Sequence, residues 1–177
     1  MNLLLATDFS YICNMNYFEL FGLPAAPSVD KTLLAKKYFE LQKESHPDFF
    51  TQGTEAEQED AVERSASINK AFNIFQNEEK TIEYFLQTVD MFETGEKYSL
   101  PPDFLMEMME INEALTEGDM DAVVKQVKEY ETALLEEVKP VIAGYDPAHT
   151  SQEHLLKLKE YYYKKKYLKR ILDRLDD

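Results

Sequence analysis

Apolar residues recur every three or four positions along most of this chain, which is the spacing of one face of an α-helix. Glycine is scarce, with 5 among 177 residues, and no long segment alternates apolar and polar residues as a half-buried strand does. The pattern therefore predicts an all-α protein.

The first half of the chain predicts one short helix followed by a pair of long ones. Asn16 is a suitable N-cap for the short helix, and Gly22 is a suitable end for it. The second helix starts near residues 28–30 and ends near residue 45, since Pro47 cannot continue it. The third covers roughly residues 55–77. We expect the two long helices to pair as an antiparallel hairpin.

A further helix is expected around residues 81–89, before a segment rich in helix breakers that ends in Leu100-Pro101-Pro102. Three more helices follow this boundary. The first spans residues 103–118 with Asp103 as its cap, and the second ends before Pro140. The third begins at a capping box formed by Thr150 and Glu153. We expect these three helices to form a small antiparallel bundle.

Composition limits the partners and compartments that fit this chain. The formal net charge of -15 argues against nucleic acid as a general partner, because phosphate binding needs a basic surface. No apolar run is long enough to cross a bilayer, and the first basic residue is Lys31, so we expect no membrane association and a cytoplasmic location. Cys13 is the only cysteine, and His149 and His154 are badly spaced for ligation. We therefore expect neither a metal site nor a cofactor.

The tripeptide His46-Pro47-Asp48 stands in the loop between the two long predicted helices. Pro47 limits the backbone there, so the flanking side chains project from a turn rather than from a helix face. An exposed Asp48 carboxylate could form a charge-assisted hydrogen bond with an arginine of another protein. The alternative is local, with Asp48 making an Asx turn and His46 capping the preceding helix. The residues alone leave both interpretations open.

The helix predicted at residues 103–118 has two different faces. One face is a complete core stripe, made of Phe104, Met108, Ile111 and Leu115. Apolar and acidic residues share the remaining surface: Leu105, Met106, Met109, Glu110, Glu113 and Glu117. Such a mixed patch with flexible methionines suits a basic protein partner. The alternative is that the bundle buries this helix on two sides.

Four segments together resemble the HscB family of J-domain co-chaperones. They are Asn16-Tyr17-Phe18-Glu19-Leu20-Phe21-Gly22-Leu23-Pro24, Leu41-Gln42 ahead of His46-Pro47-Asp48, Ser65-Ala66-Ser67-Ile68-Asn69-Lys70-Ala71-Phe72, and Phe104-Leu105-Met106-Glu107. The resemblance implies a J-domain at residues 15–90, a linker at 91–102 and a C-terminal helical bundle at 103–177. Residues 1–14 are then an N-terminal extension of unknown role.

Members of this family dock on a DnaK-like ATPase chaperone, HscA, and stimulate its hydrolysis of ATP. The resemblance implies that this contact is made by His46, Pro47 and Asp48, with Lys36, Lys37 and Lys43 steering the approach. Two features depart from the family pattern. Phe49 stands where many members have lysine, and Glu40 and Glu44 dilute the positive face.

The family also binds the iron-sulfur scaffold protein IscU through its first C-terminal helix and an aromatic residue of the last helix. The residues implied here are Leu105, Met106, Met109, Glu110, Glu113, Glu117 and Tyr167. The resemblance thus implies a co-chaperone that assists iron-sulfur cluster transfer, holds no cluster itself and is not an enzyme.

Two other functions were considered. The C-terminal bundle could bind a different client, as in a general J-domain co-chaperone. Alternatively, His46 and Asp48 could serve as the acid-base pair of a hydrolase. The second idea lacks support, because the sequence has no phosphate-cradling glycine loop, no nucleophile motif and no metal cluster.

Overall fold

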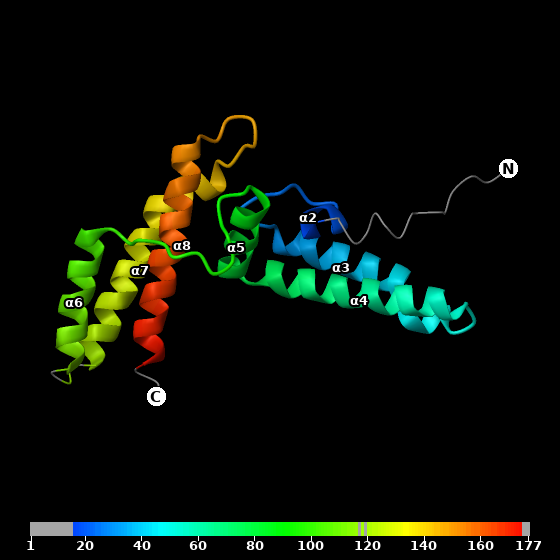
Figure 1. Cartoon of the computed structure of the whole chain (residues 1–177), viewed down its shortest axis with the longest axis horizontal. Coiled ribbons are helices and arrows are strands. Elements are labelled where there is room, and N and C mark those ends of the chain that lie inside the picture. The colour runs from blue at the N-terminus through cyan, green and yellow to red at the C-terminus, as the bar shows by residue number, and fades with distance from the viewer. Residues whose placement is uncertain (1–15, 117, 119, 175–177) are drawn as a thin grey trace. The chain divides into compact units, whose positions relative to one another are not determined.

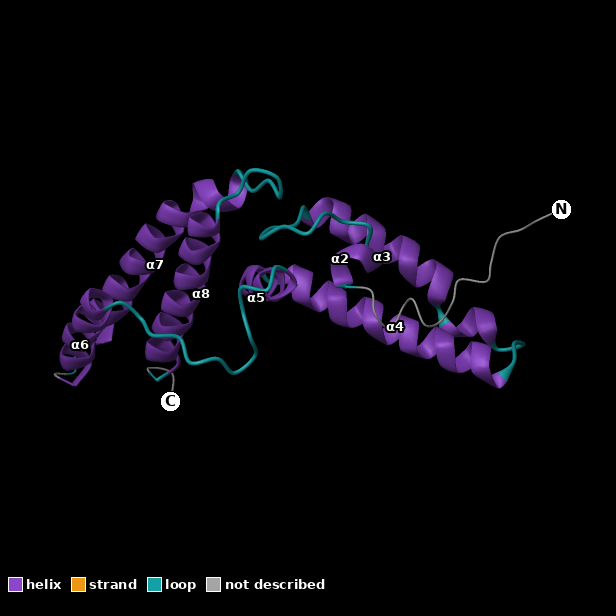
Figure 2. Ribbon diagram, turned by 45° about the horizontal axis from the view of Figure 1, so that its top comes forward, coloured by secondary structure: helices purple, strands orange, loops and turns teal. Residues whose placement is uncertain are grey.

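The computed structural model describes residues 16–116, 118 and 120–174, which contain helices and loops and no strand (Figures 1 and 2). These residues fall into two compact units that divide between Thr88 and Val89. The prediction of an all-α fold, with a helical hairpin followed by a three-helix bundle, is confirmed. The extension expected at residues 1–14 lies outside the described residues.

The first unit is built around two long antiparallel helices, α3 and α4, which lie side by side in both views (Figures 1 and 2). Its elements are α2 (Tyr17–Leu20), α3 (Lys31–Ser45), the short 3-10 helix η1 (Pro47–Phe50), α4 (Glu55–Gln76) and α5 (Glu78–Thr88).

Capping residues set the ends of these helices. The Asn16 side chain caps α2 in a capping box with Glu19, and Gly22 follows with a φ of +58°, which glycine adopts most easily. Asp30 accepts hydrogen bonds from two backbone N–H groups at the start of α3. α5 begins three residues earlier than the sequence indicates, because Asn77 Oδ1 accepts a hydrogen bond from the Lys80 N–H and caps it there.

The core of the first unit lies between α3 and α4 and continues under α2. Leu34, Ile68 and Phe75 are fully buried, and the Phe18 ring packs 4.7 Å from that of Phe75. Lys31 Nζ at the start of α3 donates to the carbonyl oxygens of Phe75 and Gln76, at the end of α4. A cation at a helix C-terminus is favourable there, so this contact fastens the hairpin at the end opposite its loop.

The second unit is a bundle of α6 (Pro102–Thr116), α7 (Met120–Ala143) and α8 (Gln152–Asp173). Its core contains fully buried side chains from all three helices: Met108, Val123, Val127, Leu158 and Leu168. None of the described helices in either unit has the length and apolar content needed to cross a membrane.

Three helix ends in this unit differ from the prediction. α6 begins at Pro102, so Asp103 lies in its first turn rather than at its cap. α7 continues through Pro140 to Ala143. Pro140 has no N–H to donate to the Glu136 carbonyl, but the helix continues past this missing hydrogen bond, and the Gly144 N–H still donates to the Pro140 carbonyl. α8 is capped by Ser151, since the Thr150 hydroxyl accepts a hydrogen bond from the Asp146 N–H instead.

The segment before α6 is fastened to α8 by a partly buried ion pair. Lys159 Nζ lies 2.8 Å from Glu96 Oε1, and the two side chains are only 15% and 20% exposed. The Tyr163 hydroxyl also donates to Glu96 Oε1 at 2.7 Å. The Tyr98 ring stacks on that of Tyr163, with centroids 4.4 Å apart. This cluster joins the connecting segment to the bundle.

The titration of Glu96 gives a stability prediction. Burial alone would raise the pKa of Glu96, but hydrogen bonds from Lys159 and Tyr163 outweigh it and hold the pKa below its ordinary value of 4.5. A lowered pKa stabilises the fold above pH 4.5, and this contribution is lost as the pH falls through the lowered value. We expect Glu96→Gln to lower the free energy of unfolding at pH 7 by about 1 kcal/mol, an estimate that allows for screening by solvent, and to have a smaller effect at pH 3.

Urea unfolding of the full chain at both pH values, followed by circular dichroism, measures this difference. Glu93→Gln is the matched control, because Glu93 is an exposed carboxylate of the same segment. An equal effect of Glu96→Gln at pH 7 and pH 3 would contradict the assignment.

Candidate functional site

The His46-Pro47-Asp48 loop joins α3 to α4 at the end of the hairpin away from α2 and α5 (Figure 2). His46 ends α3 with an extended backbone and also caps η1, whose first residue is Pro47. Proline suits this position because its φ is preset and its missing N–H would have no partner there. The loop is therefore short and ordered, as the sequence indicates.

Within the loop, the His46 ring is held by the backbone. Its Nδ1 atom accepts a hydrogen bond from the Asp48 N–H at 3.2 Å and also lies 3.5 Å from Asp48 Oδ2. The Asp48 side chain is 83% exposed, so its carboxylate remains accessible to solvent.

This geometry combines the two interpretations that the sequence leaves open. The local turn exists, but the His46 side chain makes it, whereas the Asp48 side chain does not. A hydrolytic acid-base pair is not favoured, because side chains that are 48% and 83% exposed cannot exclude water. Across the described ranges, no group of three or more His, Cys, Asp or Glu side chains is arranged to hold a metal ion.

A polar cluster holds α3 against α4 behind the loop. Asn69 Oδ1 of α4 accepts hydrogen bonds from the Tyr38 hydroxyl at 2.9 Å and from Gln42 Nε2 at 2.8 Å. The Ser65 hydroxyl donates to Gln42 Oε1, and the Tyr38 ring stacks on Phe72 with centroids 4.0 Å apart. Sequence reasoning missed this cluster, although Gln42, Ser65 and Asn69 all lie in segments that carry the family resemblance.

The solvent face of α3 carries the three lysines expected to steer a partner. Lys36 is 72% exposed, and Lys43 is exposed on the same face seven residues later. Glu40 lies between them, with carboxylate oxygens 4.0 Å from Lys36 Nζ and 3.5 Å from Lys37 Nζ. Glu40 therefore reduces the positive charge of this face through two exposed ion pairs, each of which is weak in water.

The second candidate surface lies on α6. Phe104, Met108 and Ile111 are buried in the bundle, as the helical stripe predicts, and Leu115 is half-buried. Met106 and Met109 are 64% and 62% exposed. The bundle therefore does not bury this helix on two sides. Further residues predicted for this surface are also exposed: Leu105, Glu110 and Glu113. Glu117 lies outside the described residues.

Tyr167 of α8 packs against Phe104 in the first turn of α6. Its ring is half-buried and meets the Phe104 ring edge-on, with centroids 5.7 Å apart. The Arg170 guanidinium lies 5.2 Å from the centre of the same ring, within the range of a cation–π contact. Tyr167 thus contributes to bundle packing and also has solvent-accessible area beside α6.

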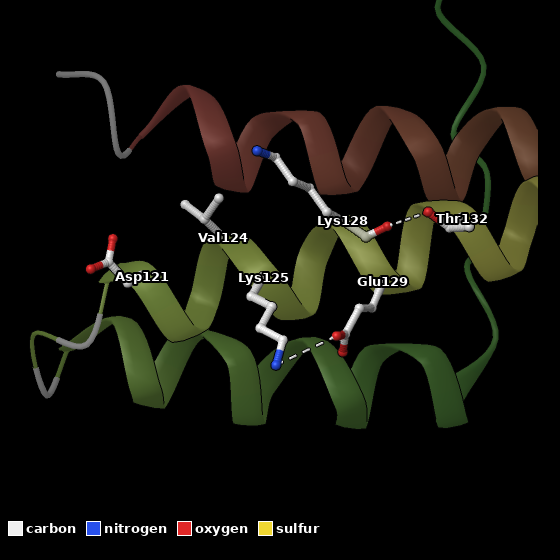
Figure 3. Close-up of a pocket in the computed structure, with 6 residues that line it drawn as sticks. All are labelled: Asp121, Val124, Lys125, Lys128, Glu129 and Thr132. Atoms are coloured by element: carbon white, nitrogen blue, oxygen red, sulfur yellow. Dashed lines mark hydrogen bonds and ion pairs between the residues drawn. The ribbon is translucent and has the colours of Figure 1, made fainter.

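Two shallow hollows lie in the second unit. One, of about 410 Å³, runs between α6 and α7 and is bordered by Glu107, Glu110, Glu129 and Tyr130. Burial and a hydrogen bond with Glu107 raise the pKa of Tyr130, so its hydroxyl stays protonated. The other, of about 500 Å³, is lined by α7 side chains that include the Lys125–Glu129 ion pair (Figure 3). Neither is enclosed as a catalytic pocket would be.

Comparison with known proteins places the chain in a family. The family model described as the HSCB C-terminal oligomerisation domain matches residues 100–176. The co-chaperone protein HscB homolog of Photobacterium profundum is 36% identical over 143 residues, which cover 80% of each chain. That of Shewanella halifaxensis is 35% identical over 82% of this chain and 90% of its own length. The chain belongs to the HscB family of co-chaperones.

Other matches agree with this assignment. The HscB homolog of Vibrio vulnificus is 42% identical over 104 residues, which span only 61% of that relative. The crystal structure of human co-chaperone protein HscB matches 98% of this chain and 84% of its own, with a TM-score of 0.73 and 27% identity. Chaperone HscB from Vibrio cholerae matches 91% of this chain and 99% of its own, with a TM-score of 0.58 and 31% identity.

Membership has a direct consequence for the two surfaces. The relatives are named co-chaperones, and a co-chaperone acts together with a chaperone. The exposed loop and the mixed face of α6 are the candidate surfaces of this chain for contact with another protein.

Proposed function

We propose that this HscB protein docks through its His46-Pro47-Asp48 loop on a DnaK-like ATPase chaperone of the HscA type and stimulates ATP hydrolysis by that chaperone. The exposed Asp48 carboxylate at the tip of a rigid hairpin carries the proposal. A carboxylate held in this way can form a bidentate, charge-assisted pair with an arginine of the chaperone. Pro47 fixes the turn, and Lys36, Lys37 and Lys43 add a weak positive field beside it.

The face of α6 is the proposed binding surface for an IscU-type iron-sulfur scaffold protein. Methionines adapt their shape to a partner, and the neighbouring carboxylates favour a basic one. The residues proposed for this contact are Leu105, Met106, Met109, Glu110, Glu113, Glu117 and Tyr167.

The proposed role is to assist iron-sulfur cluster transfer by bringing scaffold and chaperone together in the cytoplasm. Joining the two binding surfaces in one chain raises the effective concentration of scaffold at the chaperone. If both partners bias the same chaperone state, their effects on binding are reciprocal, so stimulation by both exceeds stimulation by either alone.

The loop is tested by His46→Gln. Glutamine keeps a polar side chain but removes the ring whose Nδ1 accepts from the Asp48 N–H, so the loop loses the contact that fixes it. We expect stimulation of chaperone ATPase activity to fall at least tenfold, about 1.4 kcal/mol. Steady-state ATPase assays measure this, and exposed His154→Gln in α8 is the control. Stimulation of wild-type size by His46→Gln would contradict the proposal.

The α6 surface is tested by replacing Met106 and Met109 with alanine together. Both side chains are more than 60% exposed, so folding should be little affected while the apolar contact is lost. We expect affinity for purified IscU, measured by calorimetry, to fall about tenfold or more, which corresponds to a loss of at least about 1.4 kcal/mol of binding free energy. Met120→Ala, at a methionine that is 54% exposed at the start of α7, is the control.

Chaperone stimulation measured without scaffold should be unchanged in the double variant. If the variant instead binds IscU as tightly as wild type does, the bundle serves another client, as in a general J-domain co-chaperone.

A further inference from the structure

Two phenylalanines of the first unit are exposed on the side of the molecule that carries the loop. Phe39 of α3 is 71% exposed and Phe49 of η1 is 70% exposed. Four other phenylalanines of this unit are at most 1% exposed, and Phe50 and Phe72 are half-buried; the four are Phe18, Phe21, Phe75 and Phe85. Large aromatic side chains are usually buried, so two rings left in water here need a separate explanation.

The two rings belong to one continuous stripe. Lys36, Phe39 and Lys43 follow one another at spacings of three and four residues, which places them on one face of α3. His46 comes three residues later, where the helix ends. The Phe49 ring lies edge-on to the His46 ring, with centroids 6.1 Å apart. The stripe therefore alternates cationic and aromatic side chains and reaches the loop.

Both rings are attached to ordered structure. The Phe39 ring meets the Tyr38 ring with centroids 5.9 Å apart, and Tyr38 is itself fixed by its hydrogen bond to Asn69 and by stacking on α4. The Phe49 N–H donates to the His46 carbonyl at 3.0 Å. Burial of these rings by a partner therefore costs little conformational entropy.

Charge on this face is too weak to account for docking alone. Glu40 pairs with Lys36 and Lys37, and exposed Glu44 follows Lys43. Exposed charges are also screened by salt over about 10 Å. An apolar contact is not weakened by neighbouring carboxylates in this way, and salt does not screen it.

We propose that Phe39 and Phe49 are contact residues that bury their rings against apolar side chains of the ATPase chaperone. This inference rests on the proposed function, because it assumes that the loop docks on that chaperone. The chaperone surface that receives Asp48 then presents an arginine beside apolar groups. Docking of this chain is partly hydrophobic and tolerates salt better than docking through lysines would.

The test measures chaperone ATPase rate against the concentration of full-length protein, for wild type, Phe39→Ala, Phe49→Ala and Phe49→Lys. Burial of one phenylalanine is worth about tenfold or more in affinity, so each alanine variant should raise the half-maximal concentration by about that factor. Val62→Ala, at a 55% exposed residue of α4, is the control and should match wild type. Phe49→Leu should stay within about threefold of wild type, because it keeps most of the apolar area.

Phe49→Lys separates apolar from ionic docking. It adds a positive charge beside the loop, so a purely electrostatic contact would strengthen, whereas the proposed contact weakens by about tenfold or more. The weakened binding of Phe49→Lys should also depend more steeply on salt between about 50 and 300 mM than that of wild type. A lower half-maximal concentration for Phe49→Lys would overturn the inference.

Asp48→Asn, measured in the same assay, distinguishes the two possible failures. If wild type does not stimulate the chaperone, or Asp48→Asn stimulates it equally well, the proposed function itself is wrong. If Asp48→Asn is inactive while both alanine variants match Val62→Ala, only the aromatic contact is wrong. Thermal melting of each variant checks that the fold is kept, as expected for side chains about 70% exposed.

Discussion

The antiparallel packing of α3 against α4 is the constraint on which the first binding surface depends. Buried Leu34, Ile68 and Phe75 fix the two helices together, and Asn69 bridges them by polar contacts. With both helices fixed, the chain between them has little freedom, and the backbone of that loop in turn orients His46. Asp48 is therefore presented to a partner without a large entropic cost of ordering.

Much of this arrangement follows from sequence, because helical periodicity and capping are local properties. The buried stripe of α6, and the exposure of Met106 and Met109, follow from counting 100° per residue. The path of α7 through Pro140 does not, because a proline removes a backbone hydrogen bond and strains the helix, and whether the helix still continues depends on its packing in the bundle. The role of Asn69 was also missed, since its partner Tyr38 is 31 residues away and the register of the hairpin must be known first.

The two proposed binding surfaces differ in chemistry. The hairpin side combines lysines and exposed aromatics with the exposed carboxylates of Asp48, Glu40 and Glu44, whereas α6 combines methionines with glutamates. The face of α6 therefore favours a basic partner, whereas the mixed charges of the hairpin side favour neither sign. The exposure of Phe39 and Phe49 could not be predicted from the sequence. Periodicity shows which residues share a helix face, but it does not show which face a neighbouring element covers.

The central claim is that the hairpin loop and the exposed face of α3 form one chaperone-binding surface. The most direct measurement is an NMR titration of the isotopically labelled full chain with the ATP-bound chaperone. The account predicts that backbone amide signals of residues 36–50 shift or broaden first, while those of α6 stay unchanged until scaffold is added. Perturbation confined to α6, or to the side of α4 that faces away from α3, would contradict it.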